Sequence, residues 1–378
     1  MDKKQQIVQR LTETDGFVSG QELCRMLGVS RTAVWKNIQK LKEEGYPIEA
    51  VTNRGYRLLS MQETDVFNRE QIAGKLRTAW AGRPIVFTEE TGSTNDDIFA
   101  LAAQGYPHGT LAIASRQTSG KGRRGRSWIS PPEGNIYMSI LLKPDLRPDV
   151  TPMLTVVMAL SVYQASLEQL TDIKEPAPGT GTAQHTCRFG IKWPNDIVVS
   201  LEDGPYRKLC GILTEMRMED NEISAITIGV GLNVNQTKLD PEIAQNATSY
   251  ALALGKKVNR AALTASIWNH FEENYNIFTQ TEDFVNLRPA YEAGLVNLGR
   301  HVHVLDPKSP FTGIAAGINE RGELLVQPDE QGEKPSGASG SPIAGTAPAG
   351  AGLFIDPERP LIAVGSGEVS VRGVNGYV

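Results

Sequence analysis

The chain has 378 residues and a formal net charge of −5 at pH 7, with 40% hydrophobic and 21% charged residues. This composition is typical of a soluble globular protein, and the length predicts two or three domains rather than one core. The first ten residues, MDKKQQIVQR, contain no apolar segment of a signal peptide, and the apolar run Met153–Leu160 is far shorter than the ~20 residues of a membrane-spanning helix. We therefore expect a cytoplasmic protein without a membrane partner.

The cysteine and histidine spacing gives no sign of a metal site or a disulfide framework. Cys24, Cys187 and Cys210 are scattered, and the five histidines form no cluster with metal-ligand spacing. No protein-bound metal is expected.

The charge is unevenly distributed. Residues 1–60 carry ten Lys and Arg against seven Asp and Glu, a balance of +3, so the rest of the chain must total −8. A nucleic-acid footprint, if present, therefore belongs to the first sixty residues.

Residues 18–45 predict two helices joined by a tight turn. Ser19 is placed to cap the first helix, Gly28 to end it in a left-handed conformation, and Ser30 to cap the second. Apolar residues recur at helical spacing in both segments. The expected inward-facing residues are Leu23, Met26 and Leu27 in the first helix and Val34, Ile38 and Leu41 in the second.

The polar face of the second helix and the segment after it predict DNA binding. YPIEAVTNRGYRLLS reads as two short strands around an Asn-Arg-Gly turn, a wing that brings basic side chains to backbone phosphates. A helical protein-binding module is the alternative, but capped helices, turn and wing in this order favour DNA, and the modest charge suggests a dimer. The predicted DNA-contacting residues, with a helix-turn-helix at about 20–39, are Arg31, Thr32, Trp35, Lys36, Gln39, Arg54 and Arg57.

The region from residue 63 to about 290 mixes strands and helices. The last three expected strands are joined by short turns, which predicts antiparallel pairing and an α+β domain. The expected strands are Ile85–Thr88, Leu111–Ala114, Ile136–Leu142, Ile197–Ser200, Leu209–Glu215 and Ser224–Val230, and the expected helices are Asp96–Gln104, Thr151–Leu170 and Arg260–Phe278.

The segment GKGRRGRSW, residues 120–128, concentrates four positive charges between three glycines. Its glycines fit the dinucleotide-binding fingerprint, but that fingerprint needs a helix directly afterwards, and Pro131, Pro132 and Gly134 exclude one. A glycine loop with convergent Lys and Arg beside Trp128 fits a small anionic ligand, with a solvated basic loop as the alternative.

Three further stretches carry groups suited to a ligand site. Ser93, Thr94 and Asn95 offer hydroxyls and an amide where a strand gives way to a helix, although simple helix capping would use the same residues. In IKWPND, Lys192 stands beside an aromatic residue and a Pro-Asn-Asp turn that can fix it. In IGVGLNVN, Gly229 and Gly231 permit close backbone approach and Asn233 supplies an amide.

The motifs GSTN, GKGRRGRSW, KWPND, RKLCGIL and IGVGLNVN, in this order behind a helix-turn-helix, resemble the bifunctional biotin protein ligases that also repress the biotin operon. The resemblance implies an α+β fold in three domains. These are a winged helix-turn-helix at 1–62, a class II synthetase-like catalytic domain with a mixed sheet at 63–293, and a small SH3-like β-barrel at 294–378 with a low-complexity insertion at 331–352.

The resemblance also implies the activity and its partners. The family makes biotinyl-5'-adenylate from biotin and ATP, with Mg²⁺ accompanying ATP, and transfers biotin to a lysine of a biotin carboxyl carrier domain. The adenylate-bound protein forms a homodimer that binds operator DNA.

Site residues are carried over by motif. Lys192 and Arg123 are the implied catalytic residues, and Arg372 is implied to reach the nucleotide. Lys121 stands where the family commonly has arginine, and the bulk of Trp35 on the recognition helix is a departure. The implied biotin-binding residues are Ser93, Thr94, Asn95, Gln117, Lys121, Gly122, Arg123, Lys192, Gly229 and Gly231, and those for ATP or adenylate are Arg123, Arg124, Arg126, Trp128, Lys192, Asn195 and Asn233.

Three other functions are weighed against this one. A lipoate-type protein ligase would lack the helix-turn-helix and the basic loop, and a biotin-sensing repressor without ligase activity would lack Lys192 or that loop. An RNA-binding module would use the loop itself. The sequence leaves open the operator sequence, the biotin affinity, the dimer interface, the role of the insertions 174–186 and 331–352, and the group that deprotonates the acceptor lysine.

Overall fold

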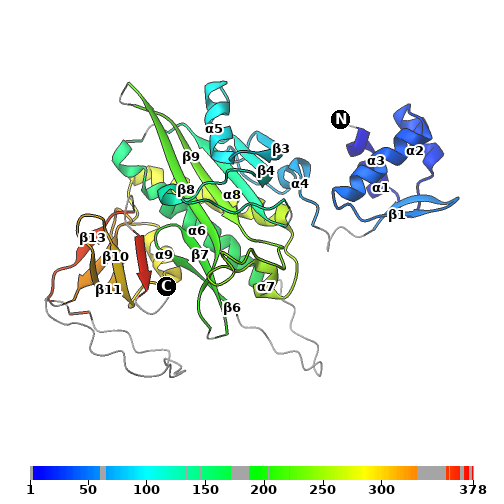
Figure 1. Ribbon diagram of the computed structural model, residues 1–378. Helices are drawn as coiled ribbons and strands as arrows, with labels where there is room; N and C mark the ends of the chain where they lie inside the picture. Colours follow the sequence, from blue (N-terminus) through cyan, green and yellow to red (C-terminus); the bar gives the residue numbers. More distant parts are fainter. Residues whose placement is uncertain are drawn as a thin grey trace. The chain divides into compact units, whose positions relative to one another are not determined.

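The computed structural model describes residues 3–59, 65–132, 134–144, 146–171, 187–202, 204–220, 222–329, 355–356, 358–366, 370–373 and 377. The chain divides into two compact units (Figure 1). The first comprises residues 1–75 and 259–263, and the second comprises residues 76–258 and 264–378.

The first unit is a helix-turn-helix with a β-hairpin wing, as the sequence predicts. Ser19 Oγ accepts a hydrogen bond from the Glu22 amide, and Ser30 Oγ accepts one from the Ala33 amide, so both predicted caps are confirmed. Gly28 ends the first of these helices at φ 63°. The elements are α1 (Lys3–Glu13), α2 (Gly20–Leu27), α3 (Arg31–Glu43), β1 (Ile48–Val51), β2 (Gly55–Leu58) and α4 (Arg69–Ala73).

The core of this unit corrects one expectation and contains one additional helix. Met26 is 41% exposed, whereas the other five predicted inward-facing residues are buried. The helix α1, which the sequence reading did not identify, buries Ile7 and Leu11 in the same core. The apolar stripe of α2 is therefore narrower than predicted, because α1 and α3 cover only part of its surface.

The wing is held to the rest of the unit by backbone hydrogen bonds. Val18 and Tyr56 exchange N–H···O bonds of 2.8 and 2.9 Å. Gly55 lies at φ +107°, and a Cβ there would stand 2.1 Å from the Val18 carbonyl oxygen. Only glycine fits this close approach.

The second unit is built on a seven-stranded mixed sheet with the order β3-β4-β5-β9-β8-β7-β6 (Figure 1). The pair β3 and β4 is parallel and all other pairs are antiparallel, which confirms the predicted antiparallel strands after residue 190. The strands are β3 (Ile85–Thr91), β4 (Leu111–Gln117), β5 (Ile136–Leu142), β6 (Cys187–Lys192), β7 (Asp196–Leu201), β8 (Arg207–Glu219) and β9 (Glu222–Leu232).

Helices α5 (Thr94–Ala103) and α6 (Met153–Thr171) pack on opposite faces of this sheet. Ile98 of α5 packs against Leu141, whereas Thr155 of α6 bonds Thr214 at 2.8 Å. The register places Leu213 in line with Gly229 and Ser139, on the same face as Leu141, and because neighbouring residues of a strand alternate, Thr214 faces the other way. The face under α5 is the one that carries the candidate site.

The remaining helices are α7 (Tyr250–Leu254), α8 (Arg260–Thr281) and α9 (Arg288–Gly294). Among the described residues, one helical stretch, Pro148–Leu170, is long and apolar enough to cross a membrane, so the sequence reading of this run was too short. In the protein, 78% of its most apolar window is buried, which is the behaviour of a core helix.

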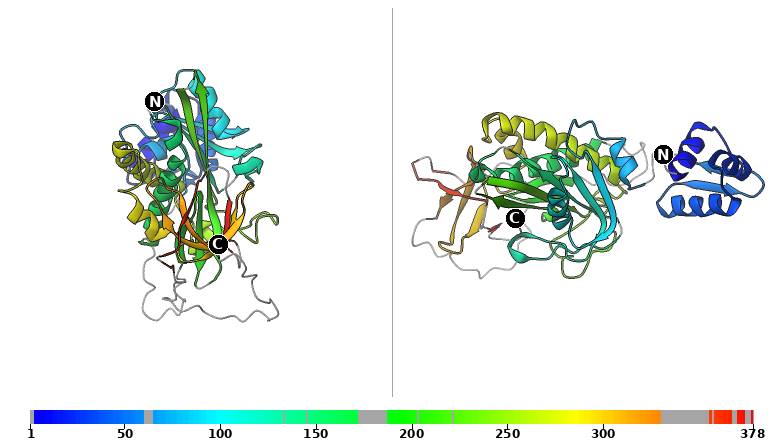
Figure 2. Two further views of the ribbon diagram at one scale, coloured as in Figure 1. Left: turned by 90° about the vertical axis from the view of Figure 1, so that its left-hand side faces the viewer. Right: turned by 90° about the horizontal axis from the view of Figure 1, so that it is seen from above.

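The last part of the second unit is a five-stranded antiparallel sheet of order β13-β12-β11-β10-β14, coloured orange to red in Figure 2. This sheet agrees with the C-terminal β domain that the resemblance implies as an SH3-like barrel. The insertions predicted at 174–186 and 331–352 lie outside the described residues. The strands are β10 (His301–Leu305), β11 (Phe311–Ile318), β12 (Leu324–Pro328), β13 (Ile362–Val364) and β14 (Ser370–Gly373).

Candidate active site

A cavity with about 460 Å³ of empty space, its open mouth included, lies on the α5 face of the seven-stranded sheet. Its wall combines hydroxyl, amide and cationic side chains with glycines and aliphatic residues. The lining residues are Ser93, Thr94, Asn95, Gln117, Lys121, Gly122, Arg123, Trp128, Asn195, Lys208, Gly211, Ile212, Leu213, Gly229, Val230 and Gly231.

Glycines in two adjacent strands make the floor flat. Gly211 of β8 pairs with Gly231 of β9. Gly229 lies two residues before Gly231 in β9 and therefore on the same face of the sheet. A Cβ at Gly229 would stand 2.2 Å from Asn95 Oδ1, and one at Gly231 would stand 2.5 Å from Trp128 Nε1. The sequence predicts that a ligand approaches the backbone closely at these glycines. In the structure, the side chains of Asn95 and Trp128 lie against the sheet at this place.

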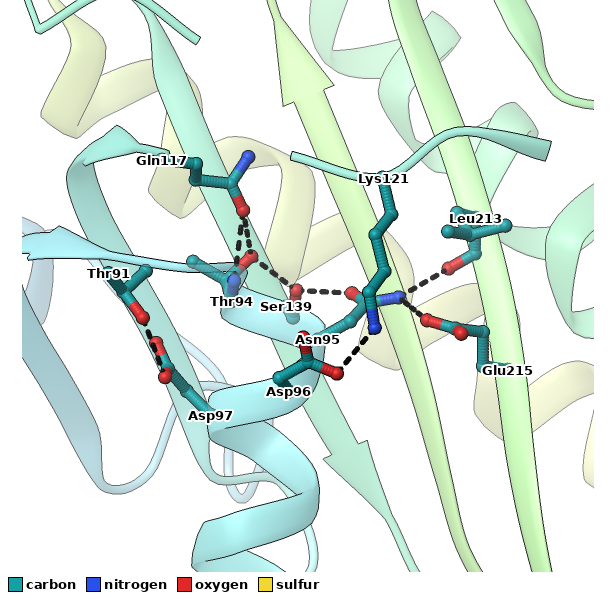
Figure 3. Close-up of polar contacts among 10 residues, drawn as sticks. All are labelled: Thr91, Thr94, Asn95, Asp96, Asp97, Gln117, Lys121, Ser139, Leu213 and Glu215. Atoms are coloured by element: carbon teal, nitrogen blue, oxygen red, sulfur yellow. Dashed lines mark hydrogen bonds and ion pairs between the residues drawn. The ribbon is translucent and has the colours of Figure 1, made fainter. Parts of the chain in front are cut away.

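A chain of hydrogen bonds runs along one end of the cavity (Figure 3). Gln117 Oε1 accepts from the Thr94 amide at 2.9 Å, and the Thr94 and Ser139 hydroxyls lie 2.6 Å apart. Ser139 donates to Asn95 Oδ1 at 2.6 Å, and Asn95 Nδ2 donates to Glu215 Oε2 at 2.6 Å. Because each partner fixes the next, the orientations of both amide side chains are determined before any ligand binds.

Ser93 occupies the position before α5 but does not cap it. Its side chain makes no capping hydrogen bond, although the residue is buried and lines the cavity. Simple capping, the alternative that the sequence left open for this hydroxyl, is therefore not what the structure shows.

The basic loop forms a small hairpin without a following helix. Gly122 N–H bonds the Arg126 carbonyl at 2.7 Å, and Trp128 N–H bonds the Gly120 carbonyl at 2.8 Å. Between them, Arg123–Gly125 makes one 3₁₀ turn in which Arg124 has φ 61°. This geometry confirms that the glycines do not form a dinucleotide-binding turn.

The cationic side chains of this loop point to different partners. Lys121 Nζ pairs with Asp96 Oδ1 at 2.5 Å, and Arg123 donates to Asn195 Oδ1 at 3.1 Å. Burial lowers the pKa of the Arg123 guanidinium, an effect that attraction to Asp196 opposes. Arg124 and Arg126 line a second hollow beside the first rather than the main cavity.

Lys192 ends β6 and is 6% exposed, but it does not line the main cavity. Its ammonium lies 3.8 Å from the centroid of the Tyr377 ring. Burial lowers the pKa of Lys192 to about 8, while the carboxylate of Asp196 acts in the opposite direction. The turn that follows is anchored by Trp193, whose indole N–H bonds the Gly322 carbonyl at 2.9 Å.

Asp196 is the centre of a buried charged cluster. Its Oδ1 lies 2.6 Å from Lys208 Nζ, and its Oδ2 accepts a hydrogen bond from the Tyr377 hydroxyl. Burial alone would raise the pKa of this carboxyl, but Lys208 and Lys192 hold it below its ordinary value. Lys208 also lies over the Trp128 ring at 5.4 Å, so the cluster borders the cavity.

The predicted DNA-contacting residues of the first unit divide into two groups. Trp35 on α3 is 53% exposed, and Arg31, Thr32 and Lys36 are exposed as well, whereas Gln39 is half-buried. On the wing, Arg57 pairs with Glu49 at 2.6 Å, and both predicted arginines lie over the Phe17 ring. The guanidinium-to-centroid distances are 4.5 Å for Arg54 and 4.8 Å for Arg57.

Three family models match successive parts of the chain. They are an HTH domain at residues 3–57, the biotin/lipoate A/B protein ligase family at 87–233 and the biotin protein ligase C-terminal domain at 298–372. The chain is 35% identical to the bifunctional ligase/repressor BirA of Bacillus subtilis over 316 residues, covering 83% of this chain and 90% of that protein. The chain belongs to the biotin protein ligase family.

Other members support this assignment. The biotin--[acetyl-CoA-carboxylase] ligase of Mycobacterium tuberculosis is 30% identical, with 68% of this chain and 87% of that protein covered. The structure of an Aquifex aeolicus biotin protein ligase in complex with biotin and ATP superposes with a TM-score of 0.55 at 26% identity, covering 77% of this chain and 99% of that one. The resemblance drawn from the five motifs is confirmed.

Most of the site residues that the sequence motifs predict line the main cavity. The residues that the structure does not bring to the main cavity are Lys192, Arg124, Arg126, Asn233 and Arg372. Asn233 is buried just after β9, where its amide N–H bonds the Leu209 carbonyl at 2.9 Å. Sequence reasoning missed Lys208, Asp196, Ser139, Glu215 and Tyr377. The first two stand inside motifs that it singled out.

Among the described residues, no group of three or more His, Cys, Asp or Glu side chains is placed to hold a metal ion. His301 and His303 share one face of β10, and His301 pairs with Asp329 at 2.7 Å.

Proposed function

We propose that this protein is an ATP-dependent biotin protein ligase that also acts as a DNA-binding repressor. The observation that carries the proposal is that a single cavity is lined both by uncharged hydrogen-bonding side chains and by cationic side chains. The hydroxyls and amides lie beside α5, and Arg123 and Lys208 line the same wall. A ligand with a polar, uncharged ring and a carboxylate that must meet a phosphate fits this distribution.

The biotin ureido ring would lie at the end of the cavity where hydrogen bonds are prearranged. Thr94 and Gln117 supply oriented groups there, and Ser93 contributes a hydroxyl that the helix does not use. Leu213 and Val230 add apolar wall for the thiophane ring and the acyl chain. The full proposed set for biotin is Ser93, Thr94, Asn95, Gln117, Lys121, Gly122, Arg123, Lys192, Gly229 and Gly231.

The reaction would proceed in two balanced steps. An oxygen of the biotin carboxylate attacks the α-phosphorus of ATP, and the bond to pyrophosphate breaks. The neutral amine of an acceptor lysine then attacks the acyl carbon, AMP leaves and the amine proton is released. Both steps gather negative charge on phosphate oxygens, so cations fixed in a buried position lower the barrier.

Lys192 and Arg123 are the proposed catalytic residues. Arg123 is held by Asn195 and by the Ser366 carbonyl, so its guanidinium is oriented in advance. Lys192 would bridge the biotin carboxylate and the α-phosphate. Mg²⁺ would arrive with ATP, bound by phosphates and water. The proposed ATP and adenylate contacts are Arg123, Arg124, Arg126, Trp128, Lys192, Asn195 and Asn233.

The regulatory part of the proposal rests on the first unit. A capped helix with an exposed face of Arg31, Thr32, Trp35 and Lys36 suits the major groove. We propose that the adenylate-bound homodimer binds operator DNA, that the protein acts in the cytoplasm, and that the acceptor is a biotin carboxyl carrier domain. The proposed domains are residues 1–62, 63–293 and 294–378.

The deciding experiment incubates the full chain with biotin, ATP and Mg²⁺ and an acceptor domain. Mass spectrometry should show one biotinyl group on the acceptor and none when ATP is omitted. Labelling with lipoate but not biotin would make it a lipoate-type ligase, and biotin binding without labelling would make it a sensor. Operator binding that strengthens with biotin plus ATP tests the repressor part, and RNA binding unaffected by them would favour an RNA-binding module.

A further inference from the structure

Tyr377 contacts two members of the buried charged cluster at once. Its ring lies over the Lys192 ammonium at 3.8 Å, and its hydroxyl donates to Asp196 Oδ2. The residue lies beyond position 372, where the match to the C-terminal family model ends. No motif of the sequence points to it.

The Lys192 ammonium contacts an aromatic ring instead of a hydrogen-bond acceptor. Among the residues that the structure describes, it makes no hydrogen bond and no ion pair, although it is 6% exposed. An ammonium has three N–H donors, and burying it without compensation is costly. The face of an aromatic ring compensates part of that cost without accepting a strong hydrogen bond. The donors therefore remain available for the oxygens of an anion.

Asp196 would be the natural competitor for those donors. It is the register partner of Lys192 across the β6–β7 turn, so both stand in one row of the sheet. Its Oδ1 forms an ion pair with Lys208 at 2.6 Å, and its Oδ2 accepts a hydrogen bond from the Tyr377 hydroxyl. Without that hydroxyl, Oδ2 would be a buried acceptor lacking its donor, with the Lys192 ammonium as a neighbouring cation.

We propose that Tyr377 is a positioning residue for Lys192. Its hydroxyl keeps Asp196 engaged and its ring covers the ammonium, so that Lys192 meets the ligand anions instead of a carboxylate of its own chain. The role rests on the proposed function, in which Lys192 bridges the biotin carboxylate and the α-phosphate. It gives the region after β14 a part in the chemistry of the central sheet.

The first test measures the ionisation of Lys192 without using the reaction. Trace labelling with acetic anhydride across a pH series is read on the tryptic peptide 189–207, in which Lys192 is the only lysine. The charged groups that act on Lys192 are Asp196, Lys208, Arg372 and Arg126, and the labelling midpoint of the wild-type protein should lie near pH 8. In Tyr377→Phe, which keeps the ring, pairing with Asp196 should raise that midpoint by about one pH unit. An unchanged midpoint overturns the proposal.

The second test measures the reaction. Tyr377→Phe should raise the KM for biotin in adenylate formation roughly tenfold, the factor that corresponds to one unit of lysine pKa, because an ion pair must first be broken. Transfer from preformed adenylate to the acceptor should change much less. Equal losses in both steps would indicate a merely structural role and would contradict the proposal.

Controls separate the outcomes. Tyr250→Phe also removes a buried tyrosine hydroxyl, one bonded to Ser166 at 2.6 Å, and should leave the Lys192 midpoint unchanged. If the hydroxyl acts through Asp196, Tyr377→Phe should have no further effect in an Asp196→Asn background. A wild-type protein that fails to biotinylate any acceptor would refute the proposed function, while the labelling midpoints would still decide the role of Tyr377.

Discussion

Replacing Gly229 by alanine tests whether the prearranged hydrogen bonds at one end of the cavity are needed for biotin. The new Cβ would stand 2.2 Å from Asn95 Oδ1, a separation that folded proteins do not show, and 3.2 Å from Asn95 Nδ2, a tight contact. Asn95 is 3% exposed, so its amide cannot swing into solvent. It must give up its bonds to Ser139 and Glu215.

The size of the effect follows from those bonds. Overpacking a dense site costs about 1–3 kcal/mol, and losing a buried hydrogen bond to a charged group costs about 1.5–3 kcal/mol. Both arise from one displacement, so we expect a loss of about 2–4 kcal/mol in the free energy of unfolding. Biotin would use the Thr94 and Gln117 groups at the other end of this series of hydrogen bonds, so it should bind roughly 10–100-fold more weakly.

Titration calorimetry with biotin and thermal unfolding of the full chain measure the two effects. Gly92→Ala is the matched control, because a Cβ there meets no atom within 4 Å. Adding Asn95→Ala to Gly229→Ala removes the clash and should recover the part of the loss that comes from overpacking, but not the part that comes from the lost hydrogen bonds. The reasoning is refuted if Gly229→Ala binds biotin and unfolds as the wild-type protein does.

Four further predictions concern Lys192 and Arg123 near the cavity and Gly55 in the wing of the first unit. Lys192→Met should slow adenylate formation, measured by pyrophosphate release, roughly 100-fold or more, and an unchanged rate would remove Lys192 from the chemistry. In the wild-type protein, kcat/KM for adenylate formation should fall above about pH 8 as Lys192 loses its proton, and a flat profile would contradict this. Arg123→Gly should release adenylate that labels bystander lysines, detected by blotting for biotin; complete retention would show that Arg123 does not hold it. Gly55→Ala should lower the stability of the first unit by about 1 kcal/mol or more and weaken operator binding, while ligation persists, as hydrogen exchange and parallel assays can show.

Sequence patterns determined the local elements and the family. Ser19, Gly28 and Ser30 act within a few residues of where they stand, so the caps of the first unit could be predicted from position alone. The prolines after the basic loop likewise excluded a helix, and short turns between strands made the pairing after residue 190 antiparallel. Each of these inferences concerns residues that are close together in the sequence, and the order of the motifs indicated the family.

Tertiary structure decided which charged groups meet. If side chains alternated strictly along β8 from Gly211, Leu209 and not Lys208 would lie on the face of the cavity. The pairing with β7 skips Leu209, however, because β8 has a bulge there. As a result, Lys208 lies on the face of the cavity and pairs with Asp196. The Tyr377 contact joins residues from distant parts of the chain, and no periodicity encodes it. Local sequence therefore fixed caps, turns and strands, whereas the bulge and the packing of the sheet fixed the electrostatics around Lys192.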